Sequence, residues 1–556
     1  MDHKKLADFL FPNITKSKDY YESLYPMRNL PENAAVTRLA PSPTGFIHLG
    51  NLYGAFADER LAHQSDGVFY LRIEDTDDKR YVDGAVEIII NSLKFFGINF
   101  DEGASLSGDL GVYTPYVQSM RGEIYQCYAK DLIAKGEAYP CFLTGEELGE
   151  IHELQEKNKE NFGIYGKWAK YRDLTFEKIK EKVDANTPFV IRLRANDYSA
   201  LASEDAPTFT VPDGIRGPLT MPKNGQDVVL LKANGIPTYH FAHAVDDHLM
   251  RTTHVIRGEE WLSSLPVHVD LFERLGFDMP IFCHTAQLMK IDEETGQKRK
   301  LSKRKDPELS LDYYRQDGYH PDAVREYLLT LLNSNFEEWR LENPTSDINE
   351  FKFSLEKMGN AGALFDLVKL NDVSKEVLLR IPAPELFAFL LNWATEVNSD
   401  FLPILRNNED MILKILDIGR TGEKPRKDLI YAKQILEFIS YFFDETFAIT
   451  DSAPENVSAD DEKAILAAYL ETYDHSDTQE MWFDKIRLIA ESLGYAKKPK
   501  DYKKNPDSFK GHVGDVSTVI RLAIVGRSQS PDVHEIQQIL GKDKTINRIQ
   551  KRLQAL

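Results

Sequence analysis

Cysteine and long apolar runs are scarce in this chain, and both scarcities limit what it can be. Only Cys127, Cys141 and Cys283 occur in 556 residues, with no close pairing in the sequence. That argues against a disulfide framework and fits a reducing compartment. No apolar run approaches the length of a membrane span, and the first residues lack the long apolar core of a secretion signal. We therefore expect a soluble, cytoplasmic protein.

A surplus of positive charge is also missing. The chain has 88 acidic and 68 basic residues and a formal net charge of −20. Proteins that bind nucleic acid must neutralise phosphates with Lys and Arg, so the composition argues against such a partner unless the positive charge is local. Each basic run in the downstream half is, taken alone, more typical of a solvated face than of a binding site. These runs are Lys298 to Lys305, Arg420 to Lys427, Lys497 to Lys504 and Lys542 to Arg552.

The stretch from 40 to 51 has the pattern of a phosphate-binding turn. An apolar run at 35–39 predicts a buried strand, and the spacing from Leu52 to His63 predicts a helix. Prolines and glycines punctuate the turn between them, and Gly50 would let backbone approach a ligand closely. Exposed N–H groups at a helix start attract phosphate, and His48 adds a side-chain donor there. Taken alone, the same residues are more typical of a Pro-rich loop with a surface histidine.

A second stretch far downstream changes that interpretation. The runs His48-Leu49-Gly50-Asn51 and Lys300-Leu301-Ser302-Lys303-Arg304 together resemble the two signatures of class I aminoacyl-tRNA synthetases. The text between them narrows the resemblance to the bacterial type of glutamyl-tRNA synthetases, through residues 71–77, 237–243, 245–248 and 255–261. The resemblance is specific from about Thr37 to Leu311 and looser beyond. The resemblance is absent from the first thirty or so residues. Their apolar side chains have helical spacing, which indicates helices that pack on the body of the protein rather than a functional site.

The alternation of predicted strands and helices, together with this resemblance, implies an α/β fold. We expect a doubly wound Rossmann-like catalytic domain with an inserted acceptor-stem-binding domain, followed by an all-helical stem-contact and anticodon-binding region. No β-barrel signature appears, which counts against a glutaminyl-tRNA synthetase with a barrel anticodon domain. The expected parts are an N-terminal extension at 1–34, catalytic halves at 35–120 and 226–305 around an insertion at 121–225, a stem-contact domain at 306–385, and an anticodon-binding domain at 386–556.

Periodicity also predicts individual elements. Strands are expected at 68–74, 190–193, 208–211, 228–232, 254–257 and 281–288. Helices are expected at 82–96, 119–135, 260–275, 324–332, 384–393, 430–443, 460–470, 482–493 and 533–540.

The resemblance implies an ATP-dependent glutamate–tRNA ligase. Glutamate would attack the α-phosphorus of ATP, with Mg²⁺ accompanying the nucleotide, and a ribose hydroxyl at the tRNA 3′ end would then accept the glutamyl group. Neither step needs a protein nucleophile, so the protein supplies positioning and charge. The catalytic candidates are His48, Lys300, Ser302 and Lys303. The ATP-binding candidates are Thr44, His48, Gly50, Asn51, Glu260, Trp261, Leu301 and Lys303.

Selection of glutamate needs a cation for its side-chain carboxylate and an acceptor for its ammonium group. Arg38 and Arg257 end predicted strands and suit the first role, because a guanidinium binds a carboxylate in a two-pronged geometry. Either arginine could instead form a surface ion pair. Glu74, at a strand end, suits the ammonium group. By resemblance Ser42, Tyr239 and His243 complete the pocket, although Asn is common in the family where this chain has His243, and the tRNA 3′ end would meet Asp77, Arg80 and Tyr81.

Zinc is bound in the insertion by some members of the family. Here Cys141 lies in matching text, but Leu143 stands where a second cysteine would be expected. One thiolate without partners at metal spacing cannot build a tetrahedral zinc site. We therefore predict no zinc.

Three other functions stay open at this point. The nearest is a non-discriminating enzyme that charges tRNA-Gln as well as tRNA-Glu with glutamate. A small-molecule nucleotidyltransferase would need no tRNA, which fits poorly with the long helical half. A non-catalytic RNA-binding homologue would not need the full set of phosphate donors. The expected partners are tRNA-Glu, L-glutamate and ATP, and the expected state is a monomer.

Overall fold

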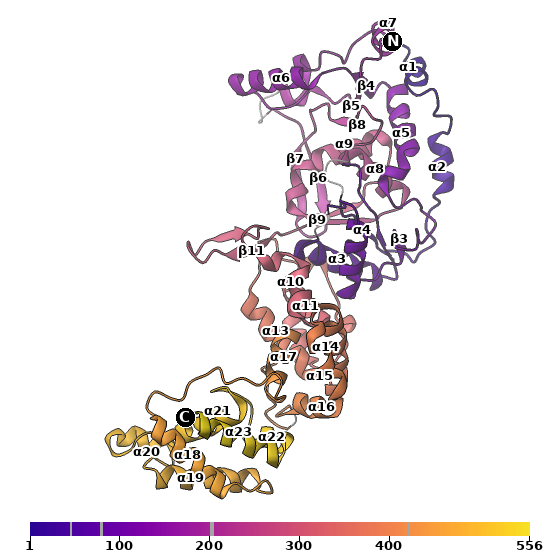
Figure 1. The fold of residues 1–556 in the computed structure, drawn as a ribbon. Helices are drawn as coiled ribbons and strands as arrows, with labels where there is room; N and C mark the ends of the chain where they lie inside the picture. Colours follow the sequence, from indigo (N-terminus) through magenta and orange to yellow (C-terminus); the bar gives the residue numbers. More distant parts are fainter. Residues whose placement is uncertain (45–46, 78–81, 201–204, 421) are drawn as a thin grey trace. The chain divides into compact units, whose positions relative to one another are not determined.

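The computed structural model describes residues 1–44, 47–77, 82–200, 205–420 and 422–556 (Figure 1). The chain forms two compact units. The N-terminal unit contains Met1–Tyr313 and Arg325–Asp366, and the helical unit contains Tyr314–Val324 and Leu367–Leu556. Each unit has its own hydrophobic core. No helix in the described part of the chain is long and apolar enough to cross a membrane.

Each predicted half of the catalytic domain contributes parallel strands to a sheet of its own. In the first half β1 (Val36–Leu39), β2 (Val68–Leu71) and β3 (Glu102–Gly103) pair in that order, joined by α3 (Leu49–His63) and α4 (Ala85–Phe95). In the second half β9 (His254–Gly258) pairs with β10 (Ile281–Thr285). The Thr253 N–H donates to the Val36 carbonyl at 3.0 Å, which joins the two halves. The doubly wound arrangement is as predicted.

The insertion has a sheet of its own. Antiparallel strands β4 (Ala138–Cys141), β5 (Val190–Leu193) and β8 (Val229–Leu231) form it, with α6 (Gly145–Asn158) and α7 (Phe176–Asp184) between β4 and β5. The expected boundary at 225/226 therefore separates β8 from its partner β5. A hairpin of β6 (Thr208–Asp213) and β7 (Gly217–Pro222) instead joins β10 of the second catalytic half.

The strand expected at 281–288 is really two strands. β10 ends at Thr285, and β11 (Leu288–Ile291) then pairs antiparallel with β12 (Lys298–Lys300). The second signature run therefore begins at the end of a hairpin strand rather than in a simple loop. The helix expected at 260–275 also divides, into a 3-10 helix Glu259–Ser264 and α9 (Leu265–Leu275).

The N-terminal extension folds into two helices that pack on α5 (Gly122–Ala134). These are α1 (His3–Leu10) and α2 (Lys18–Leu24), and their side chains Leu6, Tyr21 and Tyr25 are buried in the core of the N-terminal unit. The extension also contacts the end of α8 (Tyr239–Leu249): Glu22 Oε2 lies 2.8 Å from Arg251 Nη2. The expected helical packing is confirmed.

The helical unit matches its expected character, because its described residues from 367 onward contain no β-strand element. The six helices expected between 324 and 540 are all present, and 533–540 matches α22 residue for residue. The helices that follow the catalytic sheet are α10 (Leu311–Asp317), α11 (Pro321–Leu332), α12 (Phe336–Glu342), α13 (Leu367–Arg380), α14 (Ala383–Val397), α15 (Leu402–Asn407), α16 (Glu409–Asp417), α17 (Ala432–Ser440), α18 (Ala459–Thr472), α19 (Gln479–Ser492), α20 (Pro499–Lys504), α21 (Val513–Val525), α22 (Val533–Leu540) and α23 (Lys542–Ala555).

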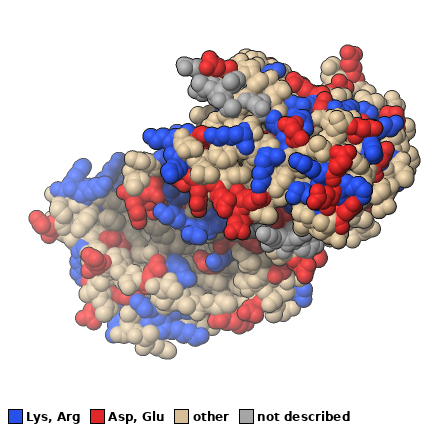
Figure 2. Space-filling model, turned by 90° about the horizontal axis from the view of Figure 1, so that it is seen from above, with Lys and Arg blue, Asp and Glu red and all other residues tan. Residues whose placement is uncertain are grey.

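Charged side chains of both signs are mixed on the face of the molecule drawn in Figure 2. On the face drawn in Figure 2, Lys and Arg lie interspersed with Asp and Glu rather than in separate fields. The net charge of −20 is therefore not spread as a uniformly acidic surface on that face. Within the described ranges, no three His, Cys, Asp or Glu side chains are grouped so that they could hold a metal ion. The absence of zinc stays a prediction.

Candidate active site

His48 begins helix α3 and is fixed by the residue three positions later. The Asn51 N–H donates to His48 Nδ1 at 3.3 Å, and the His48 N–H donates to Asn51 Oδ1 at 3.1 Å. Because Nδ1 is an acceptor, the ring proton lies on Nε2, the atom that would donate to a phosphate. Burial, followed by the charge of Lys303, lowers the pKa of His48 to about 4, so the imidazole is neutral at pH 7. The expected strand, turn and helix are confirmed here.

Gly50 packs closely against the ring of His48, two positions before it. A Cβ atom at this position would lie 3.0 Å from Cε1 and Nδ1 of His48. The sequence predicted a glycine that lets a ligand approach, and the geometry shows a glycine that makes room for the His48 ring. Thr44, on the other side of the turn, is half-buried, and its N–H donates to the Ser42 carbonyl at 2.8 Å.

The second signature run is anchored by a residue that the sequence did not single out, Asp306. Its carboxylate accepts the Ser302 N–H at 2.8 Å and two N–H groups of Arg299 at 2.6 and 2.8 Å. Arg299 contributes most to lowering the pKa of Asp306 to about 2. Leu301 is buried, whereas Lys303 is exposed. The sequence signal that could have identified Asp306 is its position directly after eight residues of which six are basic.

The two signature runs meet in space. His48 forms an antiparallel backbone bridge with Ser310, just downstream of the lysine run. The charges that act on the His48 imidazole belong to Lys303, Glu260 and Lys300, all from the second catalytic half. Trp261, beside Glu260, packs its ring against Tyr239 with centroids 4.4 Å apart. The structure therefore gathers the predicted phosphate and nucleoside candidates around one turn.

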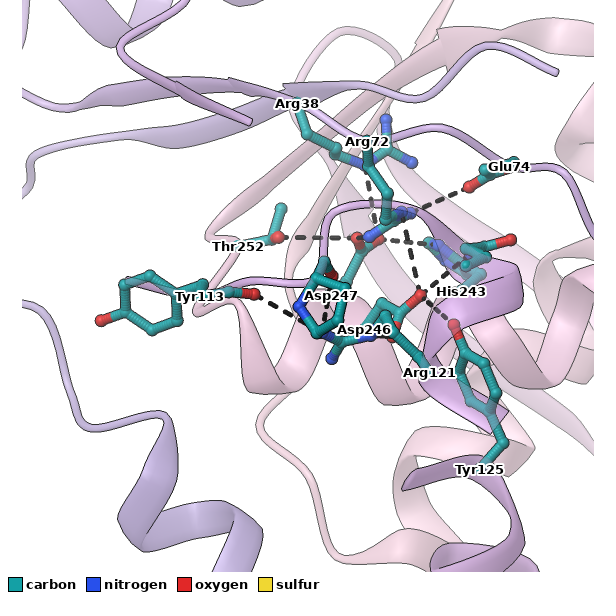
Figure 3. A network of polar contacts seen from close by, with 12 residues as sticks. Arg38, Arg72, Glu74, Tyr113, Arg121, Tyr125, His243, Asp246, Asp247 and Thr252 are labelled. Carbon is teal, nitrogen blue, oxygen red and sulfur yellow. Dashed lines mark hydrogen bonds and ion pairs between the residues drawn. The ribbon is translucent and has the colours of Figure 1, made fainter. Parts of the chain in front are cut away.

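A network of buried charges lies under the carboxyl ends of β1 and β2 (Figure 3). Its centre is Asp247 on α8, whose carboxylate lies 2.5 Å from Arg72 Nη1 and 3.4 Å from Arg38 Nε. Arg72 also donates to Glu74 at 2.9 Å. Burial opposes the charge on Asp247, but Arg72 and Arg38 hold the pKa of its carboxyl well below the ordinary value.

The neighbouring Asp246 belongs to the same network, since its Oδ2 lies 4.0 Å from Arg72 Nε. Its carboxylate accepts from Arg121 Nε at 2.7 Å, from the Tyr125 hydroxyl at 2.7 Å and from Gln118 Nε2 at 2.9 Å. The quoted stretches 71–77 and 245–248 contained Arg72, Asp246 and Asp247, but nothing in the sequence indicated their pairing. These residues, with Arg121 and Asp306, were missed by sequence reasoning.

Arg38 and Arg257 therefore occupy different electrostatic environments. Arg38 already has a carboxylate partner in Asp247. Arg257, on β9, donates instead to nitrogen atoms of His284 at 3.0 Å and His268 at 2.9 Å, and lies 3.5 Å from the Tyr239 hydroxyl. Its Nη2 is buried without a hydrogen-bond partner in the described structure. Burial lowers the pKa of Arg257, which shows the cost of a charge held without a carboxylate.

The remaining glutamate candidates surround these arginines. His243 is fully buried on α8, with Nδ1 2.7 Å from Asp247 Oδ2 and its ring stacked on Tyr239. Burial lowers the pKa of His243 to about 4, so this imidazole is neutral at pH 7. Burial also disfavours the charged form of Glu74, which raises the pKa of its carboxyl. Ser42 is exposed just beyond β1.

The candidates for the tRNA 3′ end are only partly placed. Asp77 is half-buried shortly after β2. Arg80 and Tyr81 lie outside the described residues. Asp75, two residues before Asp77, accepts the N–H and hydroxyl of Ser119 at 2.8 and 2.6 Å, in the 3-10 helix Gln118–Arg121.

Comparison with known proteins identifies the family of the chain. The family model "tRNA synthetases class I (E and Q), catalytic domain" matches residues 34–371, and an "Anticodon binding domain" model matches residues 503–553. A glutamate–tRNA ligase of Acetivibrio thermocellus is 64% identical over 554 residues, covering 100% of both chains. The chain belongs to the glutamate–tRNA ligase family. Another member, from Clostridium beijerinckii, is 46% identical and also covers 100% of both chains.

A solved structure supports the fold of this family member. A glutamate–tRNA ligase from Elizabethkingia meningosepticum, described as in complex with its amino acid, matches with a TM-score of 0.71 at 30% identity. The match covers 94% of this chain and 100% of that one. The α/β class with a helical C-terminal region is thereby confirmed.

Proposed function

We propose that the chain is an ATP-dependent ligase that joins L-glutamate to tRNA-Glu. Glutamate's α-carboxylate attacks the α-phosphorus of ATP, pyrophosphate leaves, and a hydroxyl of the 3′-terminal adenosine then takes the glutamyl group. The observation that carries the proposal is the meeting of the His48 turn with the lysine run, near Glu260. Arg257, on β9 and three residues before Glu260, has a buried nitrogen without a partner in the described structure.

The phosphate end of the site belongs to His48 and the lysine run. His48 Nε2 and Lys303 donate to phosphate oxygens as the attacked phosphorus becomes five-coordinate, which stabilises charge that develops in the transition state. Lys300 and Ser302 support this run, and Mg²⁺ arrives with the ATP phosphates, which supply the oxygen ligands it prefers. The rest of the nucleotide contacts Thr44, Gly50, Asn51, Glu260, Trp261 and Leu301.

The amino-acid end belongs to the residues around α8. Arg257 Nη2 takes the side-chain carboxylate of glutamate, because of the two arginine candidates Arg257 is the one with a buried nitrogen that lacks a partner in the described structure. Glu74 accepts from the ammonium group, and Tyr239, His243 and Ser42 complete the pocket. Arg38 contributes positive charge while it remains bound to Asp247.

The other parts of the chain would hold the tRNA. The insertion at 121–225, with Asp77, Arg80 and Tyr81, would meet the 3′ end, the part at 306–385 would contact the stem, and the part at 386–556 would read the anticodon. The match of residues 503–553 to an anticodon-binding domain supports the last assignment. We also propose a monomer, and a cytoplasmic location that suits three buried free thiols.

The deciding experiment is charging of tRNA-Glu and tRNA-Gln transcripts with labelled glutamate, ATP and Mg²⁺ in the same salt. We expect tRNA-Glu to be charged, and Lys303→Ala to slow charging by about 100- to 1000-fold, as when one transition-state donor is removed. Charging of both transcripts would make the enzyme non-discriminating. If neither accepts glutamate, or if Lys303→Ala is as fast as wild type, the function or the lysine's role is wrong.

A further inference from the structure

Arg257 is held at two edges by imidazole rings and not by a carboxylate. Its Nε–H donates to His284 Nε2 at 3.0 Å, and its Nη1 lies 2.9 Å from His268 Nδ1. Both histidines are fully buried, one on β10 and one on α9. In the described structure Arg257 has no ion pair with an acidic side chain.

The donor character of arginine fixes the protonation of both rings. A guanidinium has no acceptor, so each ring nitrogen that faces it must present a lone pair. The proton of His284 is then on Nδ1, which lies 2.6 Å from Asp213 Oδ2. The proton of His268 is on Nε2, which lies 2.9 Å from Nδ1 of His240. Two neutral rings, each oriented by a further partner, therefore support the arginine.

This support leaves Arg257 without a directly bonded carboxylate in the described structure. Arg38 and Arg72, by contrast, are held by the carboxylate of Asp247. A neutral acceptor fixes a guanidinium in place without cancelling its charge, whereas a carboxylate does both. Only 8% of Arg257 is exposed, so water screens its charge weakly. An anionic ligand at Nη2 is therefore favoured over a neutral one.

We propose that His268 and His284 are specificity-positioning residues that reserve the charge of Arg257 for the substrate's side-chain carboxylate. They would thereby favour glutamate over glutamine, whose amide has the same shape without the charge. The inference rests on the proposed function, since it assumes that Arg257 faces the amino acid. It adds that the neutrality of the two rings, as well as their position, sets the choice of substrate.

The test replaces His268 by two residues that differ only in charge. In His268→Asn the side-chain oxygen replaces the Nδ1 acceptor and remains neutral, whereas His268→Asp brings a carboxylate to the same place. The charging assay with tRNA-Glu gives KM for glutamate and for ATP, and labelled glutamine gives the rate of mischarging. We expect His268→Asp to raise KM for glutamate about 10- to 100-fold, the equivalent of one charge-assisted hydrogen bond.

The matched variant His268→Asn, and the measurements with ATP and glutamine, decide the outcome. His268→Asn should keep KM for glutamate within about threefold of wild type. KM for ATP should stay unchanged in both variants. Glutamine should compete better only in His268→Asp. In an Arg257→Gln background, His268→Asp should have no further effect on KM for glutamate, because it acts through the arginine. Equal losses in the Asn and Asp variants, or parallel increases in KM for ATP, would overturn the inference.

Two controls separate other failures from this one. If wild type does not charge tRNA-Glu, the proposed function itself fails before the histidines are tested. If His268→Asp does not fold, the same comparison moves to His284, where Gln keeps a neutral acceptor near Nε2 and Glu adds a charge. An unchanged preference for glutamate in a folded His284→Glu variant would also overturn the inference.

Discussion

The two units of the molecule bury different kinds of side chain. In the N-terminal unit, Arg38, Arg72, Arg121, Asp246 and Asp247 are all buried and hold one another by ion pairs. The core of the helical unit is an apolar cluster that continues from α14 to α23. Its buried Arg548 mainly satisfies backbone carbonyls of Tyr441 and Ile524, both at 2.7 Å. Precise placement of charge belongs to the unit that carries the candidate active site.

This difference has an energetic consequence. Apolar burial stabilises by many small contributions, so losing one side chain costs what that side chain contributed plus its cavity. A buried ion-pair network gains little net free energy when complete, but removing one partner leaves the others charged and desolvated. The N-terminal unit should therefore be more sensitive to single isosteric changes than the helical unit, and four variants test that contrast.

The largest effect is expected for Asp247→Asn. The change keeps the shape of the side chain but leaves Arg38 and Arg72 without their shared carboxylate. We expect the N-terminal unit to lose about 3 to 5 kcal/mol of unfolding free energy. Urea unfolding followed by pulsed hydrogen exchange reports peptides of the two units separately. A loss below about 1 kcal/mol would show that the network is compensated by other means.

In the helical unit the matching experiment is Ile520→Ala. Ile520 is fully buried on α21, which packs against α18, α19 and α23. Truncation should cost about 2 to 4 kcal/mol through lost burial and a cavity. Leu488→Ala is the control, because Leu488 is 59% exposed and should change stability by less than about 0.5 kcal/mol. Equal effects of the two variants would contradict the assigned core.

The sequence predicted elements well where apolar spacing decides them. Helix α22 and strand β5 match the expected ranges residue for residue. Helix α21 was not predicted, because its run of Val, Ile and Gly from 513 to 525 has low helix propensity and is helical through burial on several faces. The hairpin of β11 and β12 was also missed, since its short alternating strands are rich in lysine.

For the candidate site, the sequence predicted residues but not their partners. His48, Lys303 and Arg257 were identified from the turn, the lysine run and a strand end. The structure adds the charges that act on His48 and the histidine that contacts Arg257. The partner of Arg38 lies 209 positions away at Asp247. Pairing across that separation depends on how β1 and α8 pack, which periodicity does not encode. The difference between Arg38, bonded to a carboxylate, and Arg257, bonded to two imidazoles, therefore required the structure.

A smaller effect is expected from His243 as the pH falls. The pKa of this buried imidazole is about 4 in the folded protein, against about 6.5 when unfolded, so only the unfolded state binds a proton between these values. Its contribution to stability is complete above pH 6.5 and is lost as the pH falls toward 4. His243→Asn should therefore lose about 1.4 kcal/mol less than wild type between pH 7.5 and 5.5. Identical losses, measured by urea unfolding at both pH values, would mean that His243 is protonated in the fold.

The smallest effect is expected at Glu22, where the N-terminal extension meets the catalytic region. Its carboxylate lies 2.7 Å from His248 Nε2 and 2.8 Å from Arg251 Nη2, at the end of the helix that also carries Asp247. The side chain is 35% exposed, so solvent screens these pairs, unlike those of Asp247. Glu22→Gln should cost at most about 1 kcal/mol in unfolding free energy and leave KM for glutamate unchanged. A higher KM at unchanged stability would show instead that the extension positions α8 for substrate binding.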